Sequence, residues 1–265
     1  EWCMKKITKV AVVLAVIFAI IGITCVIASF AMGFTWDRLT GMVSEGKFNF
    51  AFELDDFHED GKGIIKVPGE KKGDVMIPNE SFRNLDIEFG AGTLEIVYAD
   101  VEKVEVQRKN TTDFSCYVEE ETLHIKGGLQ IGVNSDEGSI VVKIPRNMSF
   151  DEVDLEFGAG KANLTGLVAN SVDIEIGAGE VNLKGLDTKA LDTAVGAGKL
   201  YIELVGVEAD YNYEAECGMG DIKIGTTSVR GMGGSKEINN PGASRFMDLE
   251  CGMGEIQIEF QNQSL

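Results

Sequence analysis

Proline, histidine, cysteine and basic residues are all scarce in this sequence, and each shortage excludes a class of protein. The 265 residues include 4 prolines, 2 histidines and 5 cysteines. Scarce proline, without a glycine at every third position, excludes a collagen. Five cysteines are too few for a small fold held together by disulfides. The 24 lysines and arginines against 43 aspartates and glutamates leave a net charge of −19, which argues against nucleic acid as a partner.

The two histidines, His58 and His124, belong to no catalytic or zinc motif. Neither lies in the kind of nucleophile motif that a Ser-His-Asp or Cys-His hydrolase needs, and no spacing matches a zinc site. Gly158-x-Gly160 and similar pairs precede strands and lack the lysine of a phosphate-binding loop. The sequence therefore predicts a protein that is not an enzyme, with no catalytic and no cofactor-binding residues.

An uncharged segment near the N-terminus predicts a membrane anchor. No charged residue occurs between Lys9 and Asp37, whereas about 20 apolar residues suffice to span a bilayer. The lysines that precede it place the N-terminus in the cytoplasm by the positive-inside rule. A cleaved signal peptide is the alternative, because residues 29–31 have a small-x-small form, but the apolar segment exceeds the usual length.

The retained anchor gives a domain plan for the whole chain, with everything after the membrane helix outside the cell. The predicted segments are a cytoplasmic tail (1–9), a transmembrane helix (10–34), a juxtamembrane linker (35–47), an extracytoplasmic domain (48–260) and a polar tail (261–265). The localisation is thus the cell membrane, in a single pass.

Glycine is abundant, and many of the 32 glycines belong to a pattern that recurs six times. Each copy has alternating apolar residues, then Gly-x-Gly, then alternating apolar residues again. We number the copies 1 to 6 in chain order: Leu85–Ile96, Val153–Leu164, Val172–Leu183, Leu191–Ile202, Tyr213–Ile224 and Met247–Ile258. The glycine pairs, taken as structural turns, are Gly90 and Gly92, Gly158 and Gly160, Gly177 and Gly179, Gly196 and Gly198, Gly218 and Gly220, and Gly252 and Gly254.

The repeat predicts an all-β protein, a parallel β-solenoid or β-roll of roughly 20-residue coils, preceded by the one transmembrane helix. Alternation of apolar residues is typical of strands. Its phase shifts across the glycine pair, so we expect the pair to turn a corner between two sheets. We expect Ala178, and its counterparts Met219 and Met253, to fill the inside of that corner. The 68 residues between the first glycines of copies 1 and 2 should hold two or three less regular coils.

Outward positions before the corner form two acidic rows. If the coils stack in register, neighbouring carboxylates lie about 5 Å apart and repel one another. Calcium prefers oxygen ligands and could relieve this repulsion; the alternative is a solvated face with diffuse counter-ions. The candidate metal ligands are Asp86, Glu88, Asp154, Glu156, Asp173, Glu175, Asp192, Glu214, Glu216, Asp248 and Glu250. No other cofactor is expected.

Two cysteines, Cys217 and Cys251, occupy equivalent inward positions in copies 5 and 6. If those copies are adjacent, a disulfide is geometrically possible, and if another coil separates them it is not. Buried thiols are the interpretation favoured by the sequence. Cys116 has no counterpart in the repeat.

The anchor, the run from Ile140 to Pro145, the Gly-Ala-Gly coils and the late Glu-Cys-Gly-Met-Gly pair together resemble the bacterial putative-adhesin family. The resemblance covers about 48–260 and implies a β-solenoid-like domain outside the membrane, common in Gram-positive bacteria. The family has no agreed catalytic residues, so it adds none here.

The predicted function is a membrane-anchored, cell-surface β-solenoid with a non-catalytic binding or scaffolding role at the envelope. Its partners would be the membrane, through the N-terminal helix, and an unidentified envelope protein or glycan. One alternative is an accessory regulator of a cell-envelope stress response that acts through a membrane partner. Another is a divalent-cation-binding surface domain.

Overall fold

A computed structural model describes residues 64–67, 75–111, 114–127, 138–230 and 233–261. The chain divides into two units, 1–56 and 57–265, and every described residue belongs to the second. The predicted tail, membrane helix and linker, and the start of the predicted extracytoplasmic domain at residue 48, therefore lie outside the described residues. Among the residues that are described, no helix is both long and apolar enough to cross a membrane.

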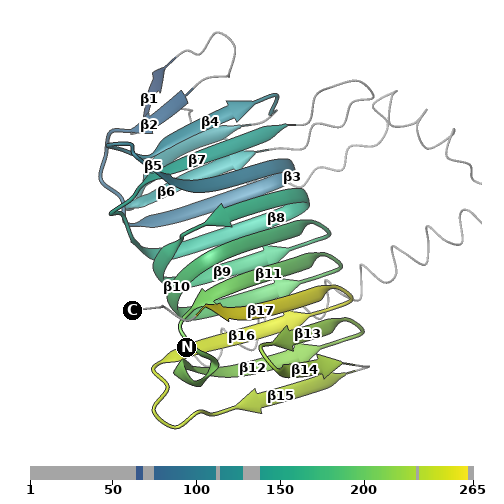
Figure 1. Ribbon diagram of the computed structural model, residues 1–265. Helices are drawn as coiled ribbons and strands as arrows, with labels where there is room; N and C mark the ends of the chain where they lie inside the picture. Colours follow the sequence, from purple (N-terminus) through teal and green to yellow (C-terminus); the bar gives the residue numbers. More distant parts are fainter. Residues whose placement is uncertain (1–63, 68–74, 112–113, 128–137, 231–232, 262–265) are drawn as a thin grey trace, which may run out of the picture. The chain divides into compact units, whose positions relative to one another are not determined.

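The described part of the chain is all-β, as predicted, and its strands form one mixed sheet of 17 strands (Figure 1). Its one helix is a short 3-10 turn, η1 (Glu208–Asp210). The strands are β1 (Ile64–Val67), β2 (Val75–Pro78), β3 (Asn84–Ala99), β4 (Glu105–Lys109), β5 (Ser115–Glu119), β6 (Thr122–Gly127), β7 (Ser139–Pro145), β8 (Phe150–Thr165), β9 (Val168–Ile176), β10 (Glu180–Val195), β11 (Lys199–Val205), β12 (Tyr211–Cys217), β13 (Asp221–Ile224), β14 (Thr227–Arg230), β15 (Gly234–Ile238), β16 (Arg245–Cys251) and β17 (Glu255–Gln261).

Successive copies of the repeat lie side by side as parallel strands in register. Copies 1 and 2 are the long strands β3 and β8, which pair residue for residue before and after the glycines, so that Phe89 faces Phe157 and Ile96 faces Leu164. Copy 3 runs from β9 into β10, and copy 4 from β10 into β11. Because each copy has the same spacing of residues within it, in-register pairing places equivalent residues next to each other along the stack.

The last two copies do not stack in chain order. Copy 4 pairs with copy 6, through β10 with β16 and β11 with β17. Copy 5 then pairs with the far side of copy 6, through β12 with β16 and β13 with β17. The order along the stack is therefore 1, 2, 3, 4, 6, 5, and Figure 1 shows β16 and β17 lying between β10–β11 and β12–β13.

The long interval between copies 1 and 2 differs from the expected series of coils. There, β6 and β7 pair in parallel with the two halves of β3 and so occupy one further level of the stack. The other two strands are antiparallel partners, β5 of β6 and β4 of β7. The sequence predicted two or three less regular coils here, but alternation of apolar residues does not distinguish a parallel coil from an antiparallel return.

The corner has a different shape from the one expected. Ile176 and Val181 are buried, but Ala178 is exposed, and its counterparts Met219 and Met253 are 57% and 38% exposed. The prediction that these side chains fill the corner was wrong. In copies 3 and 4, two consecutive residues are exposed at the corner, and the second glycine of the pair, Gly179 or Gly198, is buried instead.

Close approach explains the glycine pairs in the middle of the stack. A Cβ on Gly177 would lie 2.9 Å from the carbonyl oxygen of Gly158, and one on Gly179 would lie 2.4 Å from Cε1 of Phe157. Neither glycine has a positive φ angle. A side chain at either position would clash with the backbone or a side chain of the preceding copy. Glycine therefore lets neighbouring copies approach to the normal spacing of strands.

Candidate functional site

The two predicted acidic rows exist, and they run along one face of the stack. The pairings β3–β8, β8–β9, β9–β10, β10–β16 and β16–β12 bring equivalent carboxylates next to each other. In stack order the first row is Asp86, Asp154, Asp173, Asp192, Asp248 and Glu214, and the second is Glu88, Glu156, Glu175, Ala194, Glu250 and Glu216. We call these eleven carboxylates the acidic face.

Two basic side chains at one end of the acidic face were missed from the sequence. His124 and Lys126 on β6 lie opposite Asp86 and Glu88. The Nδ1 atom of His124 is 2.6 Å from an oxygen of Asp86, and the Nζ atom of Lys126 donates a 2.5 Å hydrogen bond to Glu88. The ring of Tyr117 stacks on His124 at a centroid distance of 4.8 Å. The apolar alternation of β6 could have revealed these outward positions.

At the other end, β15 brings a further carboxylate to the first row. Glu237 lies opposite Glu214 in the antiparallel pair β12–β15. The acidic face therefore has two basic side chains at its β6 end and an additional acid at its β15 end.

Negative charge is crowded most strongly in the middle of the rows. Partial burial between neighbouring strands and the charge of Asp86 raise the pKa of Asp154 from 3.8 to about 6. Partial burial and the charge of Asp192 raise the pKa of Asp173 from 3.8 to about 7. Partial burial, followed by the charge of Glu88, also raises the pKa of Glu156. A positive charge placed over these groups would favour their ionised forms.

The acidic face supplies oxygen atoms of the kind that calcium binds, but not an assembled site. Calcium takes about six to eight oxygen ligands. Within the described residues, no group of three or more histidine, cysteine, aspartate or glutamate side chains is arranged to hold a metal ion. The predicted calcium sites stay a prediction.

The face formed by the strand halves after the corner has mixed charge. Lys161 lies 3.5 Å from Glu180, and Lys199 lies 3.0 Å from Glu255. The charges of these four residues therefore alternate in sign across four neighbouring strands, β8, β10, β11 and β17. We call this the mixed-charge face. Unbalanced negative charge is therefore concentrated on one side of the stack.

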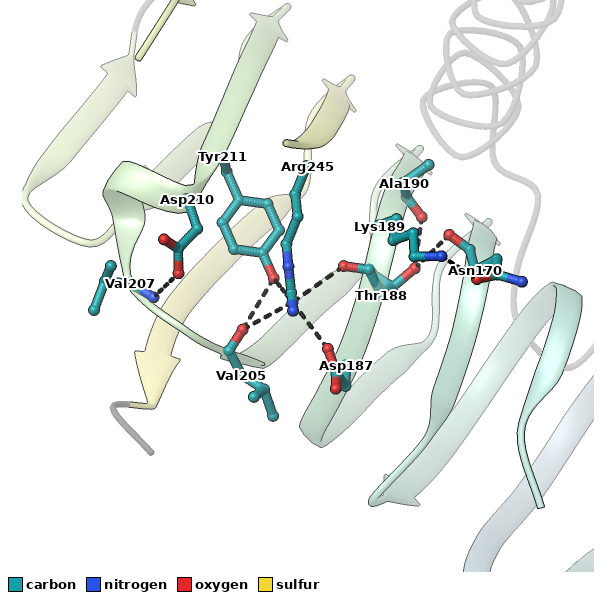
Figure 2. Close-up of polar contacts among 10 residues, drawn as sticks. All are labelled: Asn170, Asp187, Thr188, Lys189, Ala190, Val205, Val207, Asp210, Tyr211 and Arg245. Carbon is teal, nitrogen blue, oxygen red and sulfur yellow. Dashed lines mark hydrogen bonds and ion pairs between the residues drawn. The ribbon is translucent and has the colours of Figure 1, made fainter. Parts of the chain in front are cut away.

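A polar cluster around Arg245 holds β16 in its inserted place (Figure 2). The Nη1 atom of Arg245 lies 2.9 Å from Asp187 and donates hydrogen bonds to the carbonyl oxygens of Thr188 and Val205 and to the hydroxyl of Tyr211. These partners lie in the segments that flank copy 4 and lead into copy 5. The cluster is structural, because its contacts join parts of the chain to one another.

The two cysteines of the repeat are neighbours. Cys217 on β12 lies directly opposite Cys251 on β16, and both are buried thiols. Copies 5 and 6 are therefore adjacent, which was one of the two arrangements left open by the sequence.

Comparisons with known proteins identify the fold family. The model of the N-terminal domain of toast_rack, DUF2154, matches residues 66–225, which is more than half of the chain. No curated protein matches the chain. The chain is similar to a solved putative cell adhesion protein from Clostridium sporogenes, with 17% identity, coverage of 71% of this chain and 98% of that chain, and a TM-score of 0.49.

Two further solved structures are more distant. A putative adhesin from Bacteroides fragilis has 12% identity, coverage of 72% and 98% of the two chains, and a TM-score of 0.30. A putative adhesin from Parabacteroides distasonis has 9% identity, coverage of 76% and 98%, and a TM-score of 0.29. The family model ends at Ile224–Gly225, so copies 1 to 5 lie inside it and the inserted copy 6 lies beyond it. This chain belongs to the Toast_rack_N family, and the putative-adhesin resemblance of its sequence is confirmed with it.

Proposed function

We propose that this chain is a single-pass membrane protein that displays a β-solenoid on the cell surface as a non-catalytic binding or scaffolding domain. The observation that carries the proposal is the acidic face, where eleven carboxylates lie in two in-register rows. Such a surface attracts a partner with clustered positive charge and disfavours an anionic one.

The partner that fits this surface best is a basic segment of an envelope protein or a cationic envelope glycan. The raised pKa values of Asp154 and Asp173 support this, because lysine or arginine side chains would lower the repulsion that causes part of these shifts. The mixed-charge face has no comparable row of unpaired negative charge at these positions, because Lys161 pairs with Glu180 and Lys199 pairs with Glu255.

Photo-crosslinking in cells tests the proposal, with two matched triple variants. The test variant carries Asp154→Asn, Glu156→Gln and Glu175→Gln on the acidic face. The control carries Glu95→Gln, Glu203→Gln and Glu259→Gln on the other face and removes the same charge. We expect the captured partner to be lost from the test variant and retained by the control. Equal capture by both variants would contradict a role for the acidic face.

The identity of the partner separates this function from the regulator alternative. Capture of a wall polymer or a surface protein supports binding or scaffolding. Capture of a membrane sensor alone supports a regulator of the envelope stress response. Protease treatment of intact cells tests the predicted orientation, since residues after 47 should be cleaved and lost.

A divalent cation is a second candidate ligand of the same face. Closely spaced carboxylates in register, with raised pKa values at the centre of the rows, are the observation that favours it. Calcium at millimolar concentration should raise the melting temperature of the wild type above its value in a chelator, and should not raise that of the acidic-face triple variant. An unchanged wild-type melting temperature would contradict calcium binding.

A further inference from the structure

Cys217 and Cys251 are neighbours because copies 5 and 6 lie side by side in the stack. Each is the last residue before a glycine pair, on β12 and β16 respectively. The pairing of these strands is parallel and in register over seven residues, so the two cysteines face each other directly. In the observed order, Cys251 lies between Val195 of copy 4 and Cys217 of copy 5. If the copies had stacked in chain order, the two cysteines would still be neighbours, but Cys217 would lie next to Val195.

The geometry of the pair suits a covalent link. Neighbouring strands lie about 4.8 Å apart, which is within the usual range of Cα separations in disulfides, about 4.4–6.8 Å. The side chains already form a hydrogen bond with each other, and each residue is 3% exposed. The strand register therefore places the two thiols where a cross-strand bond can form.

The rest of the described structure offers neither thiol another cysteine partner. The third described cysteine, Cys116, is buried on β5, which pairs with β6. Between β6 and β16 lie β3, β8, β9 and β10. Exchange with Cys116 inside one chain would thus require the stack to unfold.

We propose that Cys217 and Cys251 form a disulfide that locks the inserted copy 6 to the terminal copy 5. The oxidant is an external disulfide, either a small molecule or a dithiol-disulfide protein. One cysteine thiolate attacks a sulfur of that oxidant and releases one thiol from it, which gives a mixed disulfide. The second cysteine then attacks its partner's sulfur and releases the other thiol. Two cysteines are oxidised, one disulfide is reduced, and the two protons of the cysteines pass to the released thiols.

The link closes a loop over the segment that leads from copy 5 back to copy 6. This segment, residues 218–250, contains β13, β14 and β15. Closing such a loop restricts the unfolded chain and so stabilises the folded one. Reduction leaves β16 and β17 held in place only by sheet hydrogen bonds, packing and the Arg245 cluster.

Burial determines when the bond can form. It raises the pKa of Cys217, and it raises the pKa of Cys251 to about 11, with the neighbouring Cys217 as the next cause. Because the thiolate is the attacking species, exchange is slow while copies 5 and 6 are closed together. Oxidation of the folded chain should therefore proceed through a local opening at this end of the stack.

Peptide mapping of the oxidised full chain tests the proposal. The variant Cys3→Ser, Cys25→Ser, Cys116→Ser, purified in detergent, keeps only the two cysteines of interest. It is incubated with oxidised glutathione under native conditions and digested with trypsin without reduction. We expect a linked pair of peptides, residues 200–223 with residues 246–265, and an intact mass lower by about 2 Da. The melting temperature should rise by about 5 °C and return on reduction.

The further substitution Cys217→Ser in the same background is the matched control. It should bind one glutathione on Cys251 and give no linked peptides and no rise in melting temperature. Circular dichroism of each variant before oxidation verifies that it is folded. Glutathione on both cysteines of the folded test variant, or a linked product only after unfolding in urea, would overturn the proposal. The test does not depend on the ligand of the acidic face, so it can fail while the proposed function holds.

Discussion

The guanidinium of Arg245 donates a hydrogen bond of 2.9 Å to the hydroxyl of Tyr211, which in turn donates one of 3.1 Å to the carbonyl oxygen of Val205. Arg245 begins β16 and Tyr211 begins β12, so this contact joins the strand that leads into copy 6 to the strand that leads into copy 5. Through Asp187, the same guanidinium also joins copy 6 to β10. One side chain therefore ties the inserted strands to the parts of the chain on both sides of them (Figure 2).

Replacing Arg245 with methionine should destabilise this end of the stack. The carbonyl oxygens of Thr188 and Val205 lose a charged donor in a place that is only partly open to water. We expect the free energy of unfolding to fall by about 2 kcal/mol, measured by urea denaturation. Amide exchange should increase first in β16 and β17, because these strands lose their anchor.

Arg230→Met is the matched control for Arg245→Met. Arg230 pairs with Asp221 at 2.9 Å, but its side chain is 68% exposed. Such a surface pair contributes about 0.5 kcal/mol or less, so stability should hardly change. If the two substitutions cost the same, Arg245 does not hold the inserted copy in place.

Thr193→Val should stabilise the protein. The hydroxyl of Thr193 is buried without a hydrogen-bond partner, between Ile174 and Leu249 of the neighbouring strands. Valine has nearly the same shape without the unsatisfied hydroxyl, so the free energy of unfolding should rise by about 1 kcal/mol. A higher midpoint of urea unfolding, with an unchanged slope, would demonstrate this gain.

Thr188→Val, five residues earlier on β10, should have the opposite sign. The hydroxyl of Thr188 is also buried, but it donates to the carbonyl oxygen of Ala190 at 2.9 Å. Its removal should cost about 1 kcal/mol. A loss of stability in Thr193→Val as large as that in Thr188→Val would mean that the Thr193 hydroxyl has a partner.

Gly179→Ala tests the close approach at the corner. The added methyl group would lie 2.4 Å from Cε1 of Phe157, so either the ring or the backbone must move. Overpacking of this kind costs about 1–3 kcal/mol. The second substitution Phe157→Leu should recover part of the loss, and a double-mutant cycle of urea midpoints measures this coupling. Purely additive effects would show that the ring does not set the need for glycine.

The repeat predicted much of the fold and of the candidate site because period-two alternation and in-register stacking are local, additive properties. The carboxylates from Asp86 to Glu250 could be assigned to two rows from the repeat alone. The exposed side chain of Ala178 was not predictable in the same way. Alternation shows that the phase changes at a corner, but not whether the extra residue points inward or outward.

The order of the last two copies could not be predicted from their sequences. Cys217 and Cys251 sit in almost the same motif, so either copy offers copy 4 a similar surface. The choice depends on contacts between distant segments, such as Arg245 with Asp187, which carry no local pattern. His124 and Lys126 are a different case. The apolar alternation of β6 indicates that both side chains point outward, but the sequence does not show that β6 pairs with β3 and so places them beside Asp86 and Glu88.

The last prediction concerns pH, because the acidic face should make the folded protein less stable as the pH rises. In the folded state, burial and neighbouring charges raise the pKa of Asp154 from 3.8 to about 6 and that of Asp173 from 3.8 to about 7. Between pH 4 and 7 the folded chain therefore binds more protons at these sites than the unfolded chain does. By linkage, the contribution of both groups to stability falls as the pH increases through this window.

Asp173→Asn should reduce this pH dependence, because asparagine is neutral throughout. We expect the midpoint of urea unfolding to fall less steeply between pH 5 and 8 in Asp173→Asn than in the wild type, and the variant to be the more stable of the two at pH 8. Asp151→Asn, an exposed position of β8 outside both rows, is the matched control and should keep the wild-type slope. Salt at high concentration should also flatten the wild-type profile, since part of the shift comes from repulsion between Asp173 and Asp192. A slope that Asp173→Asn leaves unchanged would mean that the carboxylates of the rows are spread apart in solution and do not repel one another enough to affect folding.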